Sequence, residues 1–265
     1  MQVTTRTMQV QGHRVSVGEV GEGSPLLVVN GSGANLEMLT PLMERLAGTH
    51  HVVAFDQPGM GRSAARCPTL GVPELASLAC GVLDQLGIRS ADILGYSFGG
   101  AVAQHMALVA PARVNKLVLV SSMCGIGSVP PDPLALSAAL AHIWRLPGLD
   151  RHTAAWAFGG VVGTSEKAYH DFRRRAARAF PDPVSYAGQA VAISSWSSLP
   201  WLWAITKNTL VIAGGADRSV PPVNAYVLAS LLPRAQLQVL PGAGHLLLLD
   251  QADDVARLVE TFLTR

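Results

Sequence analysis

The chain has 265 residues, of which 49% are hydrophobic and 14% charged, and its formal net charge at pH 7 is +2. This composition is typical of a compact globular protein and excludes a disordered or fibrous chain. So small a net charge gives no reason to expect nucleic acid as a partner. The apolar runs are far shorter than the roughly 20 residues that cross a bilayer, so we expect no transmembrane segment.

The cysteines and the first residues bear on the cellular compartment. Cys67, Cys80 and Cys124 are odd in number and far apart, which favours free thiols in a reducing environment. No pair has metal-ligand spacing, and we expect neither a metal nor a cofactor. The first residues lack the apolar region of a signal peptide. These features predict a cytoplasmic protein, and none of them selects an oligomeric state.

Short β-branched runs alternate with segments of helical period along most of the chain, which predicts a mostly parallel sheet covered by helices. The first two runs alternate like an antiparallel hairpin around Gly12. The third run, PLLVVN, is continuously apolar, as expected of a strand buried on both faces. The predicted strands cover residues 3–10, 13–19, 25–30, 51–55, 91–96, 116–120, 209–213 and 236–240.

The predicted helices follow these strands in turn. The first has its apolar side chains on one face, and the second covers about 73–86. Others begin at Ser97 and cover 222–231, and the last helix ends the chain. The inward-facing side chains of the first and last helices are Leu36, Leu39, Met43 and Leu46, and Val255, Leu258, Val259 and Phe262.

The alternation of strands and helices stops near residue 123 and resumes near 208. The segment between is rich in proline, tryptophan and arginine and has no strand pattern. We therefore predict an α/β core formed by 1–122 and 208–265. A helical cap, 123–207, is inserted after the sixth strand.

All five tryptophans lie within this predicted cap. Large side chains there can form the core of the cap itself, or they can line an apolar ligand pocket between the cap and the core. Trp196 and Trp201 are our first choices for pocket residues, because they lie beside the return to the core. In EKAYHDFRRRAARAF, apolar residues including Phe180 share one helical face. The arginines on its other faces indicate a solvated surface, or alternatively one that binds an anion.

The first candidate catalytic residue is Ser97, in the stretch ILGYSFGGAVAQ between a predicted strand and a predicted helix. Gly95 and Gly99 carry no Cβ, so the backbones approach closely and the serine can adopt a strained turn that exposes its hydroxyl. The turn also places the hydroxyl and the Phe98 N–H at a helix N-terminus, which favours developing negative charge. In this context G-x-S-x-G indicates a nucleophile rather than a chance match.

Two further candidates follow later strands, where open α/β sheets place ligands. Asp217 and His245 each lie in a glycine-rich loop directly after a strand. Taken alone, the first is equally a turn aspartate and the second a structural histidine. The order serine, aspartate, histidine, each after its own strand, is that of the α/β-hydrolase triad. We therefore predict that His245 deprotonates Ser97 while Asp217 fixes the imidazole tautomer.

The loop after the third strand, Asn30-Gly31-Ser32-Gly33, supplies a second donor for an oxyanion. The Ser32 N–H would converge with that of Phe98 on the carbonyl oxygen of the substrate. Plain turn chemistry is the alternative explanation of the two glycines. We include Asn30 among the substrate-binding residues.

These motifs resemble the α/β-hydrolase superfamily over essentially the whole chain, because NGSG, DQPGMGRS, GYSFGG, GGADRSVPP and GAGHLLLLD fall in the expected order. Asn30-Gly31, where most relatives have His-Gly, is similar to the intracellular medium-chain poly(3-hydroxyalkanoate) depolymerases. So are the runs WSSLPWLWAITKNTLVIAGGADRSVPPVNA and GHLLLLD. The depolymerases usually have an apolar residue in place of Ser32 and tryptophan in place of Phe98. These departures bear on the polymer substrate and leave hydrolase chemistry intact.

The resemblance implies an α/β-hydrolase fold with an eight-stranded sheet, and a cytoplasmic serine esterase acting on apolar or 3-hydroxyacyl esters. It implies Ser97, Asp217 and His245 as the triad and Ser32 and Phe98 as oxyanion donors. The substrate would be a small-molecule or polymeric ester. Acyl transfer, perhydrolysis and C–C bond hydrolysis use the same triad and stay open as alternatives. A ligand-binding module without catalysis is a third class.

Overall fold

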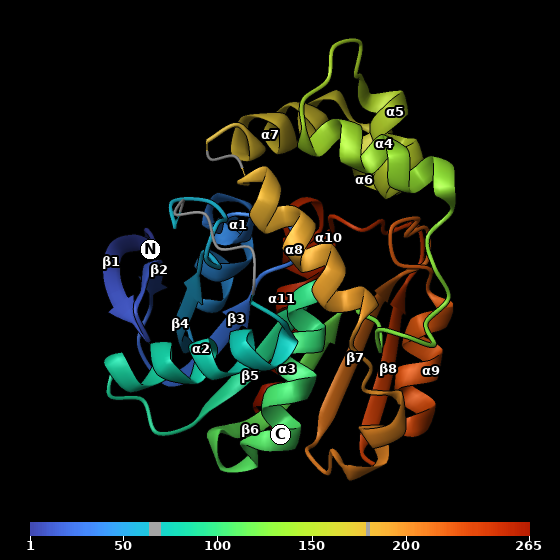
Figure 1. Ribbon diagram of the computed structural model, residues 1–265. Helices are drawn as coiled ribbons and strands as arrows, with labels where there is room; N and C mark the ends of the chain where they lie inside the picture. The colour runs from blue at the N-terminus through green and yellow to red at the C-terminus, as the bar shows by residue number, and fades with distance from the viewer. Residues whose placement is uncertain (64–69, 179–180) are drawn as a thin grey trace.

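The computed structural model describes residues 1–63, 70–178 and 181–265, and its centre is an eight-stranded sheet with helices on both faces (Figure 1). The strand order is β1-β2-β4-β3-β5-β6-β7-β8. β2 pairs antiparallel with β1 and β4, and the other neighbouring strands are parallel. The strands are β1 (Thr4–Val10), β2 (His13–Val20), β3 (Ser24–Val29), β4 (His50–Phe55), β5 (Ala91–Tyr96), β6 (Val114–Val120), β7 (Thr209–Gly214) and β8 (Ala235–Leu240). This confirms the predicted fold class.

Two layers of helices cover the sheet. Side chains of α1, α10 and α11 form one hydrophobic core with the sheet, and those of α2, α3 and α9 form another. These helices are α1 (Leu36–Leu46), α2 (Val72–Gln85), α3 (Phe98–Val109), α9 (Val223–Leu231), α10 (Leu247–Asp250) and α11 (Ala252–Leu263), with a 3-10 turn η1 (Pro111–Arg113) before β6.

The continuous apolar run of β3 is explained by these two cores. Leu27 and Val29 point into the core with α2 and α3, whereas Leu26 and Val28 point into the core with α1 and α11. Successive side chains of a strand point to opposite faces, so a strand covered on both sides needs apolar residues at every position. β3 is therefore fixed at the centre of the molecule, and the loop after it has a rigid support.

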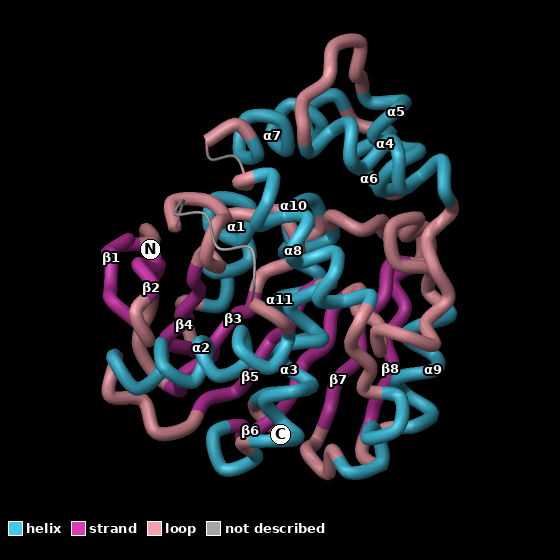
Figure 2. The backbone as a smooth tube through the Cα atoms, viewed as in Figure 1, coloured by secondary structure: helices cyan, strands magenta, loops and turns pink. Residues whose placement is uncertain are grey.

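The helices between β6 and β7, which we call the cap helices, are α4 (Pro133–Ile143), α5 (Arg151–Phe158), α6 (Val161–Thr164), α7 (Glu166–Ala176) and α8 (Pro183–Ser194), followed by a 3-10 turn η2 (Leu199–Ala204). Figure 1 shows α4 to α7 above the sheet and α8 running back from them toward the core. Figure 2 shows loops gathered between the cap helices and the near end of the sheet.

The segment between β6 and β7 is helical, as its lack of a strand pattern predicts. Among the described residues of 123–207 the structure has no strand, only an isolated bridge between Gly125 and Ser197. Tyr169 and Phe172 are buried as the helical period predicts. Phe180 and Cys67, by contrast, lie outside the described residues. Among the residues described, no helix has both the length and the apolar character needed to cross a membrane.

Candidate active site

Ser97 occupies a strained turn between β5 and α3. Its backbone has φ 53° and ψ −121°, a combination that residues with a side chain rarely adopt. The turn depends on glycine, because a Cβ on Gly95 would lie 2.5 Å from the Gly99 carbonyl oxygen, and a Cβ on Gly99 would lie 2.1 Å from that of Val29. The hydroxyl of Ser122, which follows the end of β6, donates to the Ser97 carbonyl at 3.0 Å and so helps to fix the turn.

Asp217 and His245 form a buried pair at the ends of β7 and β8. His245 Nδ1 lies 2.9 Å from Asp217 Oδ2, and Asp217 is 5% exposed. The other carboxylate oxygen accepts the backbone N–H groups of Ser219 at 2.9 Å and Val220 at 2.8 Å. Because a carboxylate only accepts, Nδ1 of His245 carries the proton and Nε2 keeps a free lone pair. The pair thus presents the nitrogen that a general base needs.

The backbone of His245 is held on both sides. Its N–H donates to the Phe158 carbonyl of α5 at 2.7 Å, and its carbonyl accepts the Tyr96 hydroxyl at 2.7 Å. The Tyr96 ring also packs beside the imidazole, with the ring centroids 5.2 Å apart. Burial raises the pKa of the Tyr96 phenol well above its ordinary value, so the phenol stays protonated and remains a donor. One cap helix and β5 therefore fix the position of the histidine.

The loop after β3 lies against the serine turn. A Cβ on Gly31 would meet the Ser97 Cβ at 3.1 Å, which places the loop in direct contact with the turn. Within the described part of the chain, neither the Ser32 N–H nor the Phe98 N–H donates to a protein acceptor. Phe98 is the first residue of α3, where a backbone N–H has no partner inside the helix. Two backbone donors are thus free next to Ser97.

Two buried glutamines connect this loop to the cap helices. Gln57 Nε2 donates to the Asn30 carbonyl at 2.8 Å, and Gln189 Nε2 of α8 donates to Gln57 Oε1 at 2.6 Å. The Gly33 N–H donates to Gln189 Oε1 at 3.2 Å, and we call this chain of three hydrogen bonds the glutamine relay. Gln57 and Gln189 are 2% and 4% exposed. Both ends of the loop are therefore tied to one cap helix, a link that sequence reasoning missed because its parts lie far apart in the chain.

A cavity of about 360 Å³ opens above Ser97 between the core and the cap helices. Ser32, Ser97 and His245 line it, so three of the predicted site residues meet at one place. The volume lies at the lower end of the range for small-molecule pockets, about 300–1,000 Å³. Most of the remaining lining is apolar, and the cap helices contribute Leu136, Ala139, Ile143, Phe158, Phe172, Ala176, Ala190 and Ile193.

Trp196 and Trp201 are not among the described residues that line this cavity, although we expected them there. The Trp196 ring packs edge-on against His105 of α3, with the centroids 6.2 Å apart. Trp201 lies in η2 and is 52% exposed. Within the cap helices, the phenyl and phenol rings that line the cavity are instead those of Phe158, Phe172 and Tyr186. Other large apolar side chains of the cap helices thus take the place that we assigned to the two tryptophans.

Asn30 lies beneath the loop rather than in the cavity lining. Its side-chain oxygen accepts the Gly31 N–H at 2.9 Å. Its Nδ2 is buried and has no hydrogen-bond partner in the described part of the chain. The side chain therefore shapes the loop from below, a role different from the substrate contact we predicted.

Two carboxyl groups near the site titrate well above their usual range. Burial raises the pKa of Asp56 and that of Asp250 to about 6 each. Asp56 accepts the backbone N–H groups of Leu36 and Arg62 at 2.7 and 2.8 Å. Asp250 accepts the Val162 N–H of α6 at 3.1 Å, and the final helix has Gln251 as its N-cap. The Asp250 carboxylate therefore holds a cap helix and does not cap the final helix.

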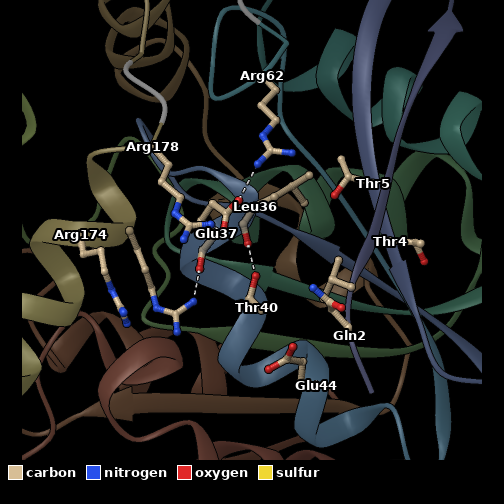
Figure 3. Close-up of a pocket in the computed structure, with 12 residues that line it drawn as sticks. Gln2, Thr4, Thr5, Leu36, Glu37, Thr40, Glu44, Arg62, Arg174 and Arg178 are labelled. Carbon is tan, nitrogen blue, oxygen red and sulfur yellow. Dashed lines mark hydrogen bonds and ion pairs between the residues drawn. The ribbon is translucent and has the colours of Figure 1, made fainter.

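Arg174 and Arg175 of α7, with Arg178 just after it and Arg62, line a second hollow, of about 710 Å³, on the outer side of α1. Figure 3 shows Arg62 and Arg178 reaching Glu37, and these ion pairs measure 2.7 and 3.2 Å. Arg174 and Arg175 pair with Asp171 on their own helix. Carboxylates thus occupy these cations, and Glu37 joins α7 to the core. Across residues 1–63, 70–178 and 181–265, no group of three His, Cys, Asp or Glu side chains could hold a metal ion.

The fold and the site agree with one protein family. The chain matches the α/β-hydrolase fold family over residues 24–252. It belongs to this family of hydrolases.

Individual relatives are similar over nearly the full length. A poly(3-hydroxyalkanoate) depolymerase of Ectopseudomonas oleovorans is 35% identical, with 91% of this chain and 84% of the relative covered. A 2-hydroxymuconate semialdehyde hydrolase of Pseudomonas putida is 33% identical over 97% of this chain and 93% of its own. The enol-lactonase of Burkholderia xenovorans LB400 superposes with a TM-score of 0.81 at 24% identity, covering 98% of this chain and 100% of that one. The last comparison supports the fold alone.

Proposed function

We propose that the protein is a serine carboxylic-ester hydrolase that works through an acyl-enzyme, with Ser97 as nucleophile, His245 as general base and Asp217 as the acid of the triad. The observation that carries this proposal is the convergence of a strained serine turn and a buried Asp–His pair on one apolar cavity. A serine hydroxyl is a weak nucleophile by itself and needs an adjacent base. The Nε2 lone pair of His245 is available for that proton.

The reaction has two halves. In the first, Ser97 Oγ attacks the carbonyl carbon while its proton passes to His245 Nε2, and the collapsing intermediate expels the alcohol, which takes that proton. In the second, water attacks the acyl-enzyme, giving its proton to His245, and the carboxylic acid leaves as Ser97 recovers the proton. Asp217 stabilises the imidazolium in each half. The proposed oxyanion donors are the free N–H groups of Ser32 and Phe98, which lie next to Ser97.

The proposed substrates are esters with an apolar or 3-hydroxyacyl group. The apolar lining of the cavity supports the first part, because burial of each CH₂ from water stabilises a bound chain by about 0.8 kcal/mol. The similarity to a poly(3-hydroxyalkanoate) depolymerase supports the second part. Polymer and small ester share this acyl chemistry.

A fluorophosphonate probe together with an ester panel tests the proposal. Purified protein should bind the probe covalently at Ser97, located by peptide mass spectrometry, and Ser97→Ala should not be labelled. The panel runs from p-nitrophenyl acetate to the hexadecanoate, beside a polyhydroxyalkanoate latex. A well-folded protein that neither reacts with the probe nor hydrolyses any of these esters would be a ligand-binding module instead.

C–C bond hydrolysis is the second candidate, favoured by the 33% identity to a 2-hydroxymuconate semialdehyde hydrolase. The same serine and histidine would serve, but the bond broken joins two carbons. Incubation with a vinylogous 1,5-diketone of the ring-cleavage type and product analysis separate the two. A kcat/KM for the diketone well above that for every ester would replace the first proposal with the second.

A further inference from the structure

His142 is a buried histidine on the wall of the cavity. It lies near the end of α4, is 1% exposed and lines the cavity above Ser97. Its ring packs among three aromatic rings of the cap helices, with centroid distances of 5.8 Å to Phe158, 6.1 Å to Tyr169 and 6.1 Å to Phe172. A ring in so apolar a cluster is held rigidly, and any polar atom it carries is costly to leave unpaired.

Hydrogen bonds around Thr153 fix which nitrogen of His142 carries the proton. His142 Nε2 lies 3.0 Å from Thr153 Oγ1. The single proton of the Thr153 hydroxyl has two Asp150 acceptors, the carbonyl at 2.8 Å and Oδ1 at 3.2 Å, and the oxygen also accepts the Asp150 N–H at 3.0 Å. With its proton given to Asp150, Thr153 accepts from His142, and we therefore assign the ring proton to Nε2. Nδ1 consequently keeps a lone pair and is an acceptor.

No described group of the protein donates to Nδ1 of His142, although the atom is buried. Burial, reinforced by the positive charge of Arg173, lowers the pKa of His142 to about 4. The ring is therefore neutral near pH 7, and Nδ1 remains an acceptor rather than a second donor. His142 lines the cavity, whereas Thr153, the partner of its Nε2, does not. A buried acceptor without a partner calls for an explanation.

We propose that Nδ1 of His142 accepts a hydrogen bond from a hydroxyl group on the acyl chain of the substrate, so that the cavity selects hydroxyacyl esters over plain acyl esters. This inference rests on the proposed ester hydrolysis. A site built to pair a substrate hydroxyl disfavours the analogue without it, because the buried acceptor is then left unpaired once the chain fills the cavity. The aromatic rings around His142 do not compete for the hydroxyl, and the Arg173 side chain, whose charge lowers the pKa of His142, does not donate to Nδ1.

The test compares ethyl octanoate with the ethyl esters of 3-, 6- and 8-hydroxyoctanoic acid, which differ only in the hydroxyl and its position. For the wild-type protein we expect kcat/KM for at least one hydroxy ester to exceed that for octanoate by roughly tenfold or more. His142→Leu should bring this ratio to about one. His142→Asn retains an oxygen acceptor near the position of Nδ1 and should keep part of the preference.

Two further variants guard against a trivial loss of folding. Thr153→Val leaves the histidine in place but removes the acceptor for Nε2–H, so the ring can take the other tautomer and the preference should fall. The matched control is His105→Leu, because His105 also has a buried Nδ1 without a partner but lies outside the cavity lining. It should leave the ratio unchanged.

The outcomes distinguish a failure of the hydroxyl preference from a failure of the proposed ester hydrolysis. If the protein hydrolyses octanoate and every hydroxy ester equally well, the inference is wrong and ester hydrolysis stands. A preference that survives in both His142→Leu and Thr153→Val would also overturn it. If no ester is hydrolysed and the fluorophosphonate probe does not label Ser97, the proposed function fails and takes this inference with it.

Discussion

Ser97 has a positive φ of 53° in the turn between β5 and α3. Alanine can adopt this backbone conformation at a similar energetic cost, because both residues carry a Cβ. Ser97→Ala should therefore fold normally while ester turnover falls by on the order of 10⁴ to 10⁶, because no acyl-enzyme can form. Steady-state rates with p-nitrophenyl octanoate measure the loss of turnover. A circular dichroism spectrum and an unfolding curve show whether the variant folds normally. Near-normal activity in a folded variant would remove the proposed nucleophile.

Asp217 is buried and Asp250 is partly buried near the site, but only Asp217 bonds to His245. Asp217→Asn should lower turnover by roughly 10⁴, since an amide favours the wrong imidazole tautomer. Asp250→Asn is the matched control and should have little effect on kcat, because its carboxylate bonds to the backbone of α6. A mild Asp217→Asn combined with a severe Asp250→Asn would show that the acid of the triad is Asp250.

Residue patterns predicted the meeting of Ser32, Ser97 and His245 because each follows an apolar run that is legible as a strand. The carboxyl ends of parallel strands meet at one edge of a sheet, so the topology brings such residues together. The partner of Asp250 could not be predicted in this way. Its hydrogen bond goes to Val162 of α6, and which cap helix lies over α10 depends on packing between elements that share no local pattern.

The contact between α10 and α6 should make the free energy of unfolding depend on pH. The folded-state pKa of Asp250 is raised to about 6 from an ordinary 3.8, so folding favours the protonated form. This contribution is fully present below about pH 4 and is lost as pH rises through about 6. Asp250→Asn mimics the protonated acid. Its stability relative to wild type should therefore rise by about 1–3 kcal/mol between pH 4 and pH 7.5.

Urea unfolding at the two pH values measures this difference. Burial also raises the pKa of Asp56 to about 6, so Asp56 contributes to the pH dependence of both proteins. The difference in unfolding free energy between the variant and the wild type therefore reports on Asp250 alone. A relative stability that stays constant across this range would mean that Asp250 ionises normally in the folded protein.

The glutamine relay joins α8 to the loop after β3, and removing it should destabilise the fold. Gln189→Leu leaves the Gly33 N–H and the Gln57 Oε1 without partners in a buried place. Each unpaired group costs about 1–3 kcal/mol. Urea unfolding at pH 7 should show a loss in that range or above it. Val191→Ala on the same helix, where the side chain is 66% exposed, should change stability by less than about 0.5 kcal/mol. Equal effects of the two substitutions would contradict the relay.

Helical period was a reliable guide to which side chains the core buries, and a poor guide to which ones meet a ligand. Leu39, Met43 and Leu46 of α1 are buried as predicted, because a helix on a sheet has one inward face. Trp196 lies at the junction of the cap segment with the core, where its ring contacts α3 instead of the cavity. Residue size and position along the chain predict burial near the cap, but the direction of a side chain at such a junction is decided by tertiary packing.

The cavity lies where the cap helices meet the core. The core supplies Ser97 and the Asp217–His245 pair, while Phe158 from α5 and Gln189 from α8 hold the histidine and the loop in place. The cap helices thus contribute the apolar wall of the cavity and part of the framework that holds His245 and the loop after β3. Movements of the cap relative to the core would change binding and catalysis together.

This arrangement predicts how rate should depend on the acyl chain. Each CH₂ that the cavity buries should add about 0.8 kcal/mol, roughly fourfold in kcat/KM if expressed in the transition state. Specificity should climb from acetate to about octanoate esters and then level off. Phe172→Ala removes part of the apolar wall and should flatten this slope more than it lowers acetate turnover. Trp201→Ala, outside the lining, is the matched control and should leave the slope unchanged. A steady preference for acetate over octanoate in the wild-type protein would rule out an acyl pocket and point to small, polar esters.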